Sequence, residues 1–444
     1  MPAFLTCRRS ITDSRKNGDA AAMDHASGLL LSCFRNDLPE AALEQLRGLP
    51  GSSWEGLVQA ALSHNLAPFL YHSMRPLFAD LTVPLEVQQR LKEAYFRSAA
   101  RNMRIYNELL SILRSFNAAG VPVILLKGVH LAELVYGNIA LRPMGDVDLL
   151  VKHPDLLHAH ELLVAQGYAA PPQNTGNALW HLPPYNKTNS PTVEIHYNIV
   201  NPPLSQRFAV EELWERARPV AIQGVEALTL CPEDLLLHLC AHTAIDHGLE
   251  IGLLPFFDIA RIIEHYRDEI DWDRLLHRAG QWGLRNCVYL VLSLSKKMAG
   301  LSLPEHLLAD SRPDAPAARE LAAAEELVFE GCTPVASDIA RLFGNESLAV
   351  KLRYCLRQIF PAGEAMRVVH PQVQSRLSLF VQYLFRIKGL FKMQGRIACL
   401  LLLRDKKMRE YEQIENRRNK LKDWLLLDTQ TAAKKINIST IITK

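Results

Sequence analysis

Apolar residues recur every three or four positions through the first part of the chain, which is the spacing of an amphipathic helix. The pattern is regular from Leu38 and again over 87–119. Asn117-Ala-Ala-Gly120 then supplies the glycine stop that is typical of a helix C-terminus. Residues 24–118 are therefore predicted to form a helical N-terminal segment.

The pattern changes after Gly120 to short apolar runs separated by turn residues. Thr-Val-Glu-Ile-His-Tyr at 192–197 alternates with the period of two of a strand, and two earlier runs are short and rich in Val, Ile and Leu. The expected strands are 121–126, 146–151 and 192–197. Helical spacing returns between them, over 129–136 and 154–166. Residues 119–205 are thus predicted to form a small α/β core.

Helical spacing resumes after the third strand. We expect 206–310 to be a helical segment that packs on the core, and 311–425 to be a second helical region with a basic end. Both ends of the chain are polar. Residues 1–23 are expected to be a disordered leader, or to precede a start at Met23, and 426–444 a flexible tail. No internal repeat is visible.

Length and composition fit several domains of an ordinary globular protein. The 444 residues are 48% hydrophobic and 22% charged, which is enough to bury more than one core. The formal net charge of +3 is too small for a dedicated nucleic-acid binder, so no duplex DNA partner is expected. No apolar run approaches the roughly 18 residues of a membrane span. Eight cysteines without any C-x-x-C pair favour neither zinc nor disulfides, and a cytoplasmic protein is the expectation.

Positive charge is concentrated near the C-terminus. Residues 386–422 contain 12 Lys or Arg against 4 Asp or Glu. The simplest interpretation is a solvated helical face. The next is a site for an anionic partner, such as RNA or a phosphorylated acceptor, and peripheral membrane contact is the least favoured because apolar and basic residues do not segregate cleanly.

Three acidic residues carry the candidate chemistry. Asp146 and Asp148 lie two apart on a predicted strand, so their side chains share one face. Glu194 lies on the third strand and shares its face with Thr192 and His196. Neighbouring carboxylates repel one another unless a cation joins them, and Mg²⁺ prefers oxygen ligands of this kind. D-x-D alone is a common pattern, but three acids on neighbouring strands, after a glycine turn, suit a two-metal in-line transfer.

The order of these motifs resembles the uncharacterised nucleotidyltransferase family of the DNA polymerase β-like superfamily. The resemblance is carried by Leu-Leu-Lys-Gly-Val-His-Leu at 125–131, Arg-Pro-Met-Gly-Asp-Val-Asp-Leu-Leu-Val at 142–151 and Val-Glu-Ile-His-Tyr at 193–197. Leu-Leu-Leu-His-Leu-Cys-Ala-His at 235–242 is similar to a helical part of the family. The resemblance implies an α+β fold, with a small mixed sheet flanked by largely helical N- and C-terminal segments.

The resemblance also assigns roles to individual residues. It implies metal ligands at Asp146, Asp148 and Glu194. Gly128 matches the glycine of the superfamily's Gly-Ser turn, where backbone N–H groups meet phosphate. No serine follows Gly128 here, so the charge of Lys127 is expected to replace that contact, and Arg142 is expected to clamp phosphate.

The predicted activity is Mg²⁺-dependent transfer of a nucleoside monophosphate from a nucleoside triphosphate to a hydroxyl of a small-molecule or protein acceptor. Two Mg²⁺ ions are expected, with Mn²⁺ as a substitute, and Glu194 is the expected general base. The alternative is an inactive module that keeps the fold and binds a nucleotide or a protein partner.

Histidines and aromatic residues offer further candidates. For His196, a structural role is favoured over a catalytic one. One helical stretch carries three histidines, His238, His242 and His247. We favour buried, hydrogen-bonded histidines there over a metal site. Trp180–Tyr185 lies in a long loop from Pro171 to Pro191, and it is a candidate cover for the nucleotide or the acceptor.

Overall fold

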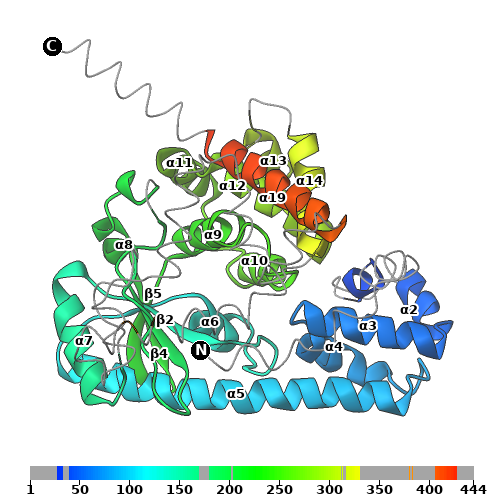
Figure 1. The fold of residues 1–444 in the computed structure, drawn as a ribbon, viewed down its shortest axis with the longest axis horizontal. Helices are drawn as coiled ribbons and strands as arrows, with labels where there is room; N and C mark the ends of the chain where they lie inside the picture. Colours follow the sequence, from blue (N-terminus) through cyan, green and yellow to red (C-terminus); the bar gives the residue numbers. More distant parts are fainter. Residues whose placement is uncertain are drawn as a thin grey trace, which may run out of the picture.

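A five-stranded mixed sheet forms the centre of the protein, and helices cover both of its faces (Figure 1). The computed structural model describes residues 28–33, 40–169, 180–201, 204–311, 313, 317–330, 380, 383 and 406–427. The predicted leader 1–23, most of the C-terminal tail and much of 311–405 lie outside these residues. The α+β fold expected from the sequence is confirmed.

The N-terminal part is helical, as predicted. It consists of α2 (Glu40–Arg47), α3 (Gly51–Ser63), α4 (Ala67–Met74), η1 (Arg75–Leu77) and α5 (Leu85–Ala118). The 34-residue α5 runs the length of the molecule, with α3 and α4 on its first half and the sheet on its second half (Figure 1). The helix ends where the glycine stop was expected, since Gly120 has a φ of +72° that suits glycine.

The sheet has the strand order β3-β2-β1-β5-β4. Its strands are β1 (Ile124–Leu125), β2 (Asp146–Leu150), β3 (Thr192–His196), β4 (Arg218–Ile222) and β5 (Val225–Thr229). The pairs β2–β3 and β1–β5 are parallel, and β1–β2 and β4–β5 are antiparallel. Between the first three strands lie α6 (Lys127–His130), the π-helix η2 (Leu131–Val135), η3 (His153–Asp155) and α7 (Leu156–Ala165).

The β4–β5 hairpin corrects the prediction, which placed only helices after Val210. Gln223 and Gly224 join the two strands with φ values of +48° and +80°. Positive φ at both positions is the pattern of a type I′ turn, whose twist suits a hairpin. β4 lies at the edge of the sheet, where Pro219 does not interrupt the ladder. The hairpin therefore extends the sheet beyond the core expected at 119–205.

The two faces of the sheet pack on different helices. Val147, Leu149 and Val193 lie in one hydrophobic core with the second half of α5 and with α7. Leu150 lies in the other core, together with α9 (Pro232–Ala241) and α10 (Leu254–His265). Because side chains alternate along a strand, Asp148 and Glu194 point to the α9 side.

The remaining helices build on α9 and α10. They are η4 (Leu204–Gln206), α8 (Glu211–Arg216), the π-helix η5 (His242–Asp246), α11 (Trp272–Trp282), α12 (Arg285–Ala299), α13 (Glu305–Asp310), α14 (Ala318–Glu330) and α19 (Lys406–Leu425). Within the part of the chain that the structure describes, none of the helices combines the length and the apolar character needed to cross a membrane.

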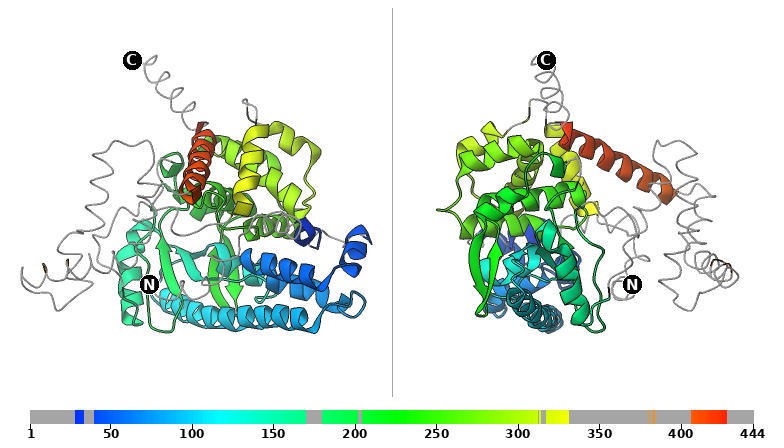
Figure 2. Two further views of the ribbon diagram at one scale, coloured as in Figure 1. Left: turned by 45° about the vertical axis from the view of Figure 1, so that its right-hand side comes forward. Right: turned by 90° about the vertical axis from the view of Figure 1, so that its left-hand side faces the viewer.

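The C-terminal helix α19 returns to the body of the protein and packs on α14 and α12 (Figure 2). The Asn286 side chain donates to the Trp424 carbonyl at 2.9 Å, and Arg418 pairs with Glu250 at 2.5 Å. The part of the basic segment 386–422 that belongs to α19 is therefore a docked helix. The first 20 residues of the segment, 386–405, lie outside the described residues.

Candidate active site

Strand register brings two of the predicted acids face to face. β2 and β3 are parallel, and Asp148 is the partner of Glu194 in the ladder. The same register places Asp146 beside Thr192 and Leu150 beside His196. Residues two apart on a strand share a face, so Asp146, Asp148 and Glu194 all lie on the α9 side of the sheet.

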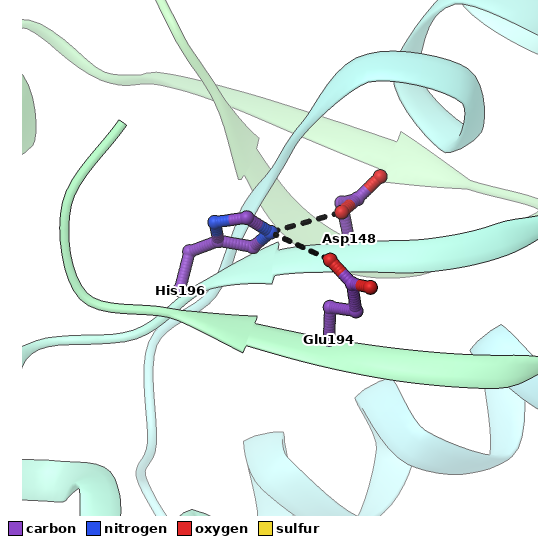
Figure 3. A group of neighbouring side chains, drawn as sticks. All are labelled: Asp148, Glu194 and His196. Carbon is purple, nitrogen blue, oxygen red and sulfur yellow. Dashed lines mark hydrogen bonds and ion pairs between the residues drawn. The ribbon is translucent and has the colours of Figure 1, made fainter. Parts of the chain in front are cut away.

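His196 joins the two opposed acids. Figure 3 shows one nitrogen of its imidazole pointing toward both the Asp148 and the Glu194 carboxylates. Nε2 of His196 lies 2.9 Å from Oδ1 of Asp148 and 3.6 Å from Oε2 of Glu194. Asp148, Glu194 and His196 each offer a ligand atom within 4.8 Å of the others. The histidine is hydrogen-bonded, as its structural interpretation required, but its bond is to a site residue.

Lys127 contributes the other contact to Asp148. Its Nζ lies 3.0 Å from Oδ1 of Asp148, and its side chain is 14% exposed. Lys127 begins α6, separated from β1 by Leu126, and has a φ of +47°, a left-handed conformation that is uncommon outside glycine. The first turn of α6 is fixed to α5, because the Tyr106 hydroxyl donates to the Val129 carbonyl at 3.0 Å. The ammonium is therefore held inside the acidic cluster.

Opposite charges dominate the electrostatics of the cluster. Burial alone would raise the pKa of the Asp148 carboxyl, but Lys127 and His196 outweigh burial and hold that pKa well below its usual value. Burial likewise opposes the charged form of His196, yet Asp148 and Glu194 raise the pKa of its imidazole. Asp148 is thus a carboxylate near neutral pH.

Asp146 occupies the outer end of the cluster. Its side chain is exposed at the start of β2, although the surrounding protein removes much of its water. This desolvation and then the neighbouring Asp148 raise the pKa of Asp146 to about 6. Among the described residues, none makes a hydrogen bond or ion pair with the Asp146 carboxylate, which leaves its oxygens open to a ligand.

The Arg142 guanidinium forms its ion pair with α10, and it lies close enough to Asp146 to interact with the charge of that carboxylate. Its Nε and Nη2 bind Asp258 on α10, with a 2.9 Å contact from Nη2 to Oδ2, and Tyr136 donates to the same carboxylate at 2.9 Å. Nη1 lies against Gly128, where a Cβ atom would come within 2.7 Å of it. Arg142 thus holds the loop before β2 against α10, and its contact with phosphate stays a prediction. Asp258 was missed, because nothing local marks a partner 116 residues away.

Of the three histidines interpreted as buried and hydrogen-bonded, His238 meets that description. His242 is half-buried, with Nδ1 3.7 Å from Oδ2 of Asp246, and His247 is exposed. His238 is buried, and its Nδ1 lies 2.9 Å from the Ile199 carbonyl. In the described part of the chain, the one group of three ligand atoms close enough for a metal is the Asp148 cluster, so His238, His242 and His247 form no second group. Asp246 accepts from Asn201 at 2.7 Å.

The described part of the long loop extends the sheet. From Trp180 to Tyr185 it pairs with β3, as in the bond from Leu182 N–H to the Ile195 carbonyl at 2.7 Å. Tyr185 is buried, with its hydroxyl 2.9 Å from Nδ1 of His160, so it belongs to the core and does not cover a ligand. His181 instead reaches His196, with 5.2 Å between their ring centroids.

A comparison with protein-family models matches residues 50–300 to the family described as uncharacterised nucleotidyltransferase. The chain belongs to this family. It is therefore an enzyme of nucleotidyltransferase type, and the family implies a nucleotide substrate. The match runs from α3 to α12 and includes every residue of the acidic cluster of this nucleotidyltransferase. No curated protein and no solved structure matches the chain.

Proposed function

We propose that this nucleotidyltransferase moves a nucleoside monophosphate from a nucleoside triphosphate to a hydroxyl of a small-molecule or protein acceptor. The reaction would take place on the α9 side of the sheet, at Asp146, Asp148 and Glu194. The observation that carries the proposal is the register of β2 and β3, which sets Asp148 opposite Glu194 beside the buried ammonium of Lys127.

The donor set fits a hard divalent ion, and we propose Mg²⁺ with Mn²⁺ as a substitute. Carboxylate oxygens dominate the cluster, and the ligand atoms of Asp148, Glu194 and His196 lie within 4.8 Å of one another. Asp148 and Glu194 would hold the ion, with Asp146 as a further ligand. When bound, the ion would stabilise negative charge on the phosphate and lower the pKa of the attacking hydroxyl.

The chain's own residues would orient the reactants. The Glu194 side chain is 24% exposed, so an acceptor can reach it, and it is the proposed base for the acceptor proton. Lys127 would face the triphosphate with a positive charge that is already inside the site. Backbone groups of the turn at Gly128 would meet the phosphates, and pyrophosphate would leave from that side.

Calorimetry tests the proposal directly. The full chain and the variant Asp146→Asn/Asp148→Asn would each be titrated with ATP, GTP, CTP and UTP, with and without Mg²⁺. We expect Mg²⁺-dependent binding of at least one triphosphate by the wild type and its loss in the double variant. That triphosphate, labelled at the α-phosphate, would then serve to screen hydroxyl acceptors.

Asp268→Asn provides the matched control, because Asp268 is an exposed aspartate after α10 and outside the site. It should bind as the wild type does. If the wild type binds none of the four triphosphates, the enzymatic proposal fails, and an inactive module with the same fold becomes the better explanation.

A further inference from the structure

Two nitrogen atoms lie within hydrogen-bond distance of the same oxygen of Asp148. Nζ of Lys127 lies 3.0 Å from Oδ1, and Nε2 of His196 lies 2.9 Å from it. A carboxylate oxygen offers about two lone-pair positions. These contacts therefore occupy Oδ1, and Oδ2 is the oxygen that remains for a metal ion.

A site with two metal ions would require both oxygens of the Asp148 carboxylate to bind metal. Two metal ions in such sites lie roughly 3.5–4 Å apart. An acid between them binds one ion through each of its oxygens. Asp148 is the central acid here, since it shares β2 with Asp146 and lies opposite Glu194 on β3. With Oδ1 occupied, Asp148 can serve one ion.

Lys127 is built into this position by the backbone. It has a φ of +47°, while Gly128 after it does not lie in the positive-φ region, so the strained conformation falls on the lysine. Glycine would adopt that conformation freely. A lysine with a strained backbone and a largely buried side chain is unfavourable unless an opposite charge pairs with its ammonium. Here the ammonium pairs with Asp148.

We propose that the ammonium of Lys127 takes the place of one of the two metal ions, so that the enzyme holds a single divalent ion. That ion would be held by Oδ2 of Asp148 and by Glu194, with Asp146 as a further ligand. Lys127 supplies the second positive charge that faces the triphosphate. The inference rests on the proposed function and replaces the expectation of two ions.

Counting ions provides the test. The full chain would be loaded with Mn²⁺ and, in turn, with the non-hydrolysable α,β-methylene analogues of ATP, GTP, CTP and UTP. Ions that stay with the chain after gel filtration are counted, and their electron paramagnetic resonance spectrum is recorded. We expect one ion per chain and the spectrum of an isolated Mn²⁺, because two ions roughly 4 Å apart would be magnetically coupled.

Three variants separate the charge of Lys127 from its structural role. Lys127→Gly suits the positive φ and removes the ammonium, so we expect two coupled ions per chain. Lys127→Arg keeps the charge and should bind one. Lys187→Met is the matched control, because Lys187 forms a similar partly buried pair with Glu108 at 2.6 Å, outside the cluster, and it should also bind one.

The outcomes distinguish this inference from the proposed function. Two coupled ions in the wild type would overturn the inference and leave nucleotidyl transfer intact. A single ion in Lys127→Gly would also overturn it, because the ammonium would then not be what excludes the second ion. If the wild type retains neither ion nor analogue, the proposed function itself fails, and the inference fails with it.

Discussion

Asp148 on β2 lies directly opposite Glu194 on β3, across a parallel strand pair. Neighbouring strands lie roughly 4.8 Å apart, so the two carboxylates meet without any loop to position them. A shift of register by one residue would turn Glu194 to the α5 side of the sheet. The apolar neighbours Val193 and Ile195 are fully buried on that side, and they fix the register that the site needs.

Glu194→Gln should slow transfer strongly without unfolding the protein. Glu194 is partly exposed and lies 3.6 Å from His196, so its charge contributes little to stability. Losing a metal-binding carboxylate that is also the proposed base should slow transfer by about a thousandfold, which corresponds to roughly 4 kcal/mol at the transition state. Steady-state release of pyrophosphate measures the rate, and thermal unfolding checks the fold.

Glu226→Gln is the control for this change, because Glu226 is an exposed glutamate on β5 of the same sheet. It should leave both the rate and the melting temperature unchanged. A Glu194→Gln protein that keeps more than a tenth of the wild-type rate would contradict the assignment of Glu194.

The sequence was sufficient where the relevant pattern is local. A period of two along 192–197 already placed Glu194 and His196 on one face, and the D-x-D pair needed no more than strand geometry. The β4–β5 hairpin was missed, although its Gln223-Gly224 turn is a local signal, because Pro219 and the short strands weaken the alternation.

Partners of the site residues could not be predicted, because tertiary packing alone selects them. Arg142 and Asp258 are 116 residues apart, and either could have been a surface charge. Lys127 was expected to contact phosphate, and its bond to Asp148 was not foreseen, because that bond depends on the strained φ and on the antiparallel pairing of β1 with β2. A single sequence shows neither of these.

The buried pair of Arg142 and Asp258 should be essential for stability. Their side chains are 13% and 4% exposed, and the pair is bidentate. Asp258→Asn leaves the Arg142 guanidinium buried without its counter-charge, so we expect a loss of about 3–5 kcal/mol in the free energy of unfolding. Denaturant titration followed by circular dichroism measures this loss.

A double-mutant cycle separates pairing from packing. Arg142→Met/Asp258→Leu replaces both charges with apolar groups, and its loss of stability should be much smaller than the sum of the losses in Arg142→Met and Asp258→Leu alone. If the double variant is as unstable as the sum of its single changes, Arg142 and Asp258 act independently and the pair does not explain the position of the loop.

Gly128→Ala should destabilise the turn that carries Lys127. A Cβ atom there would lie 2.7 Å from Nη1 of Arg142 and 3.0 Å from Met144. Arg142 cannot swing away freely, because Asp258 holds its other nitrogens. Overpacking of this kind costs about 1–3 kcal/mol, measurable by denaturant unfolding.

Gly51→Ala is the comparison for Gly128→Ala. Gly51 begins α3, and nothing lies within 4 Å of the position of an added Cβ atom. Alanine should therefore be neutral there or stabilise the helix by up to roughly 1 kcal/mol. Equal effects of the two substitutions would mean that crowding at Gly128 is not what excludes a side chain.

Acid should destabilise the protein partly through His64, which lies far from the acidic cluster. Its side chain is buried against Gly252 and Phe329, and burial lowers the pKa of His64 to about 4 from the ordinary value of 6.5. In the unfolded chain the imidazole takes up a proton as the pH falls below about 6.5, whereas in the folded protein it stays neutral down to about 4. The stability that the protein gains by keeping His64 neutral is therefore fully present above pH 6.5. It is lost as the pH falls to 4, and the total loss in the free energy of unfolding is about 3 kcal/mol.

Unfolding titrations between pH 4 and pH 7 measure this dependence against two variants. His64→Leu cannot take up the proton, so the slope of its unfolding free energy with pH should be smaller than that of the wild type by up to about 1.4 kcal/mol per pH unit. His72→Leu removes an exposed histidine from the neighbouring helix α4 and should keep the wild-type slope. Loss of packing in His64→Leu would lower the unfolding free energy equally at every pH. It would therefore leave the slope with pH unchanged and could not account for the predicted difference in slope. Parallel curves for wild type and His64→Leu would show that His64 takes up its proton equally in both states.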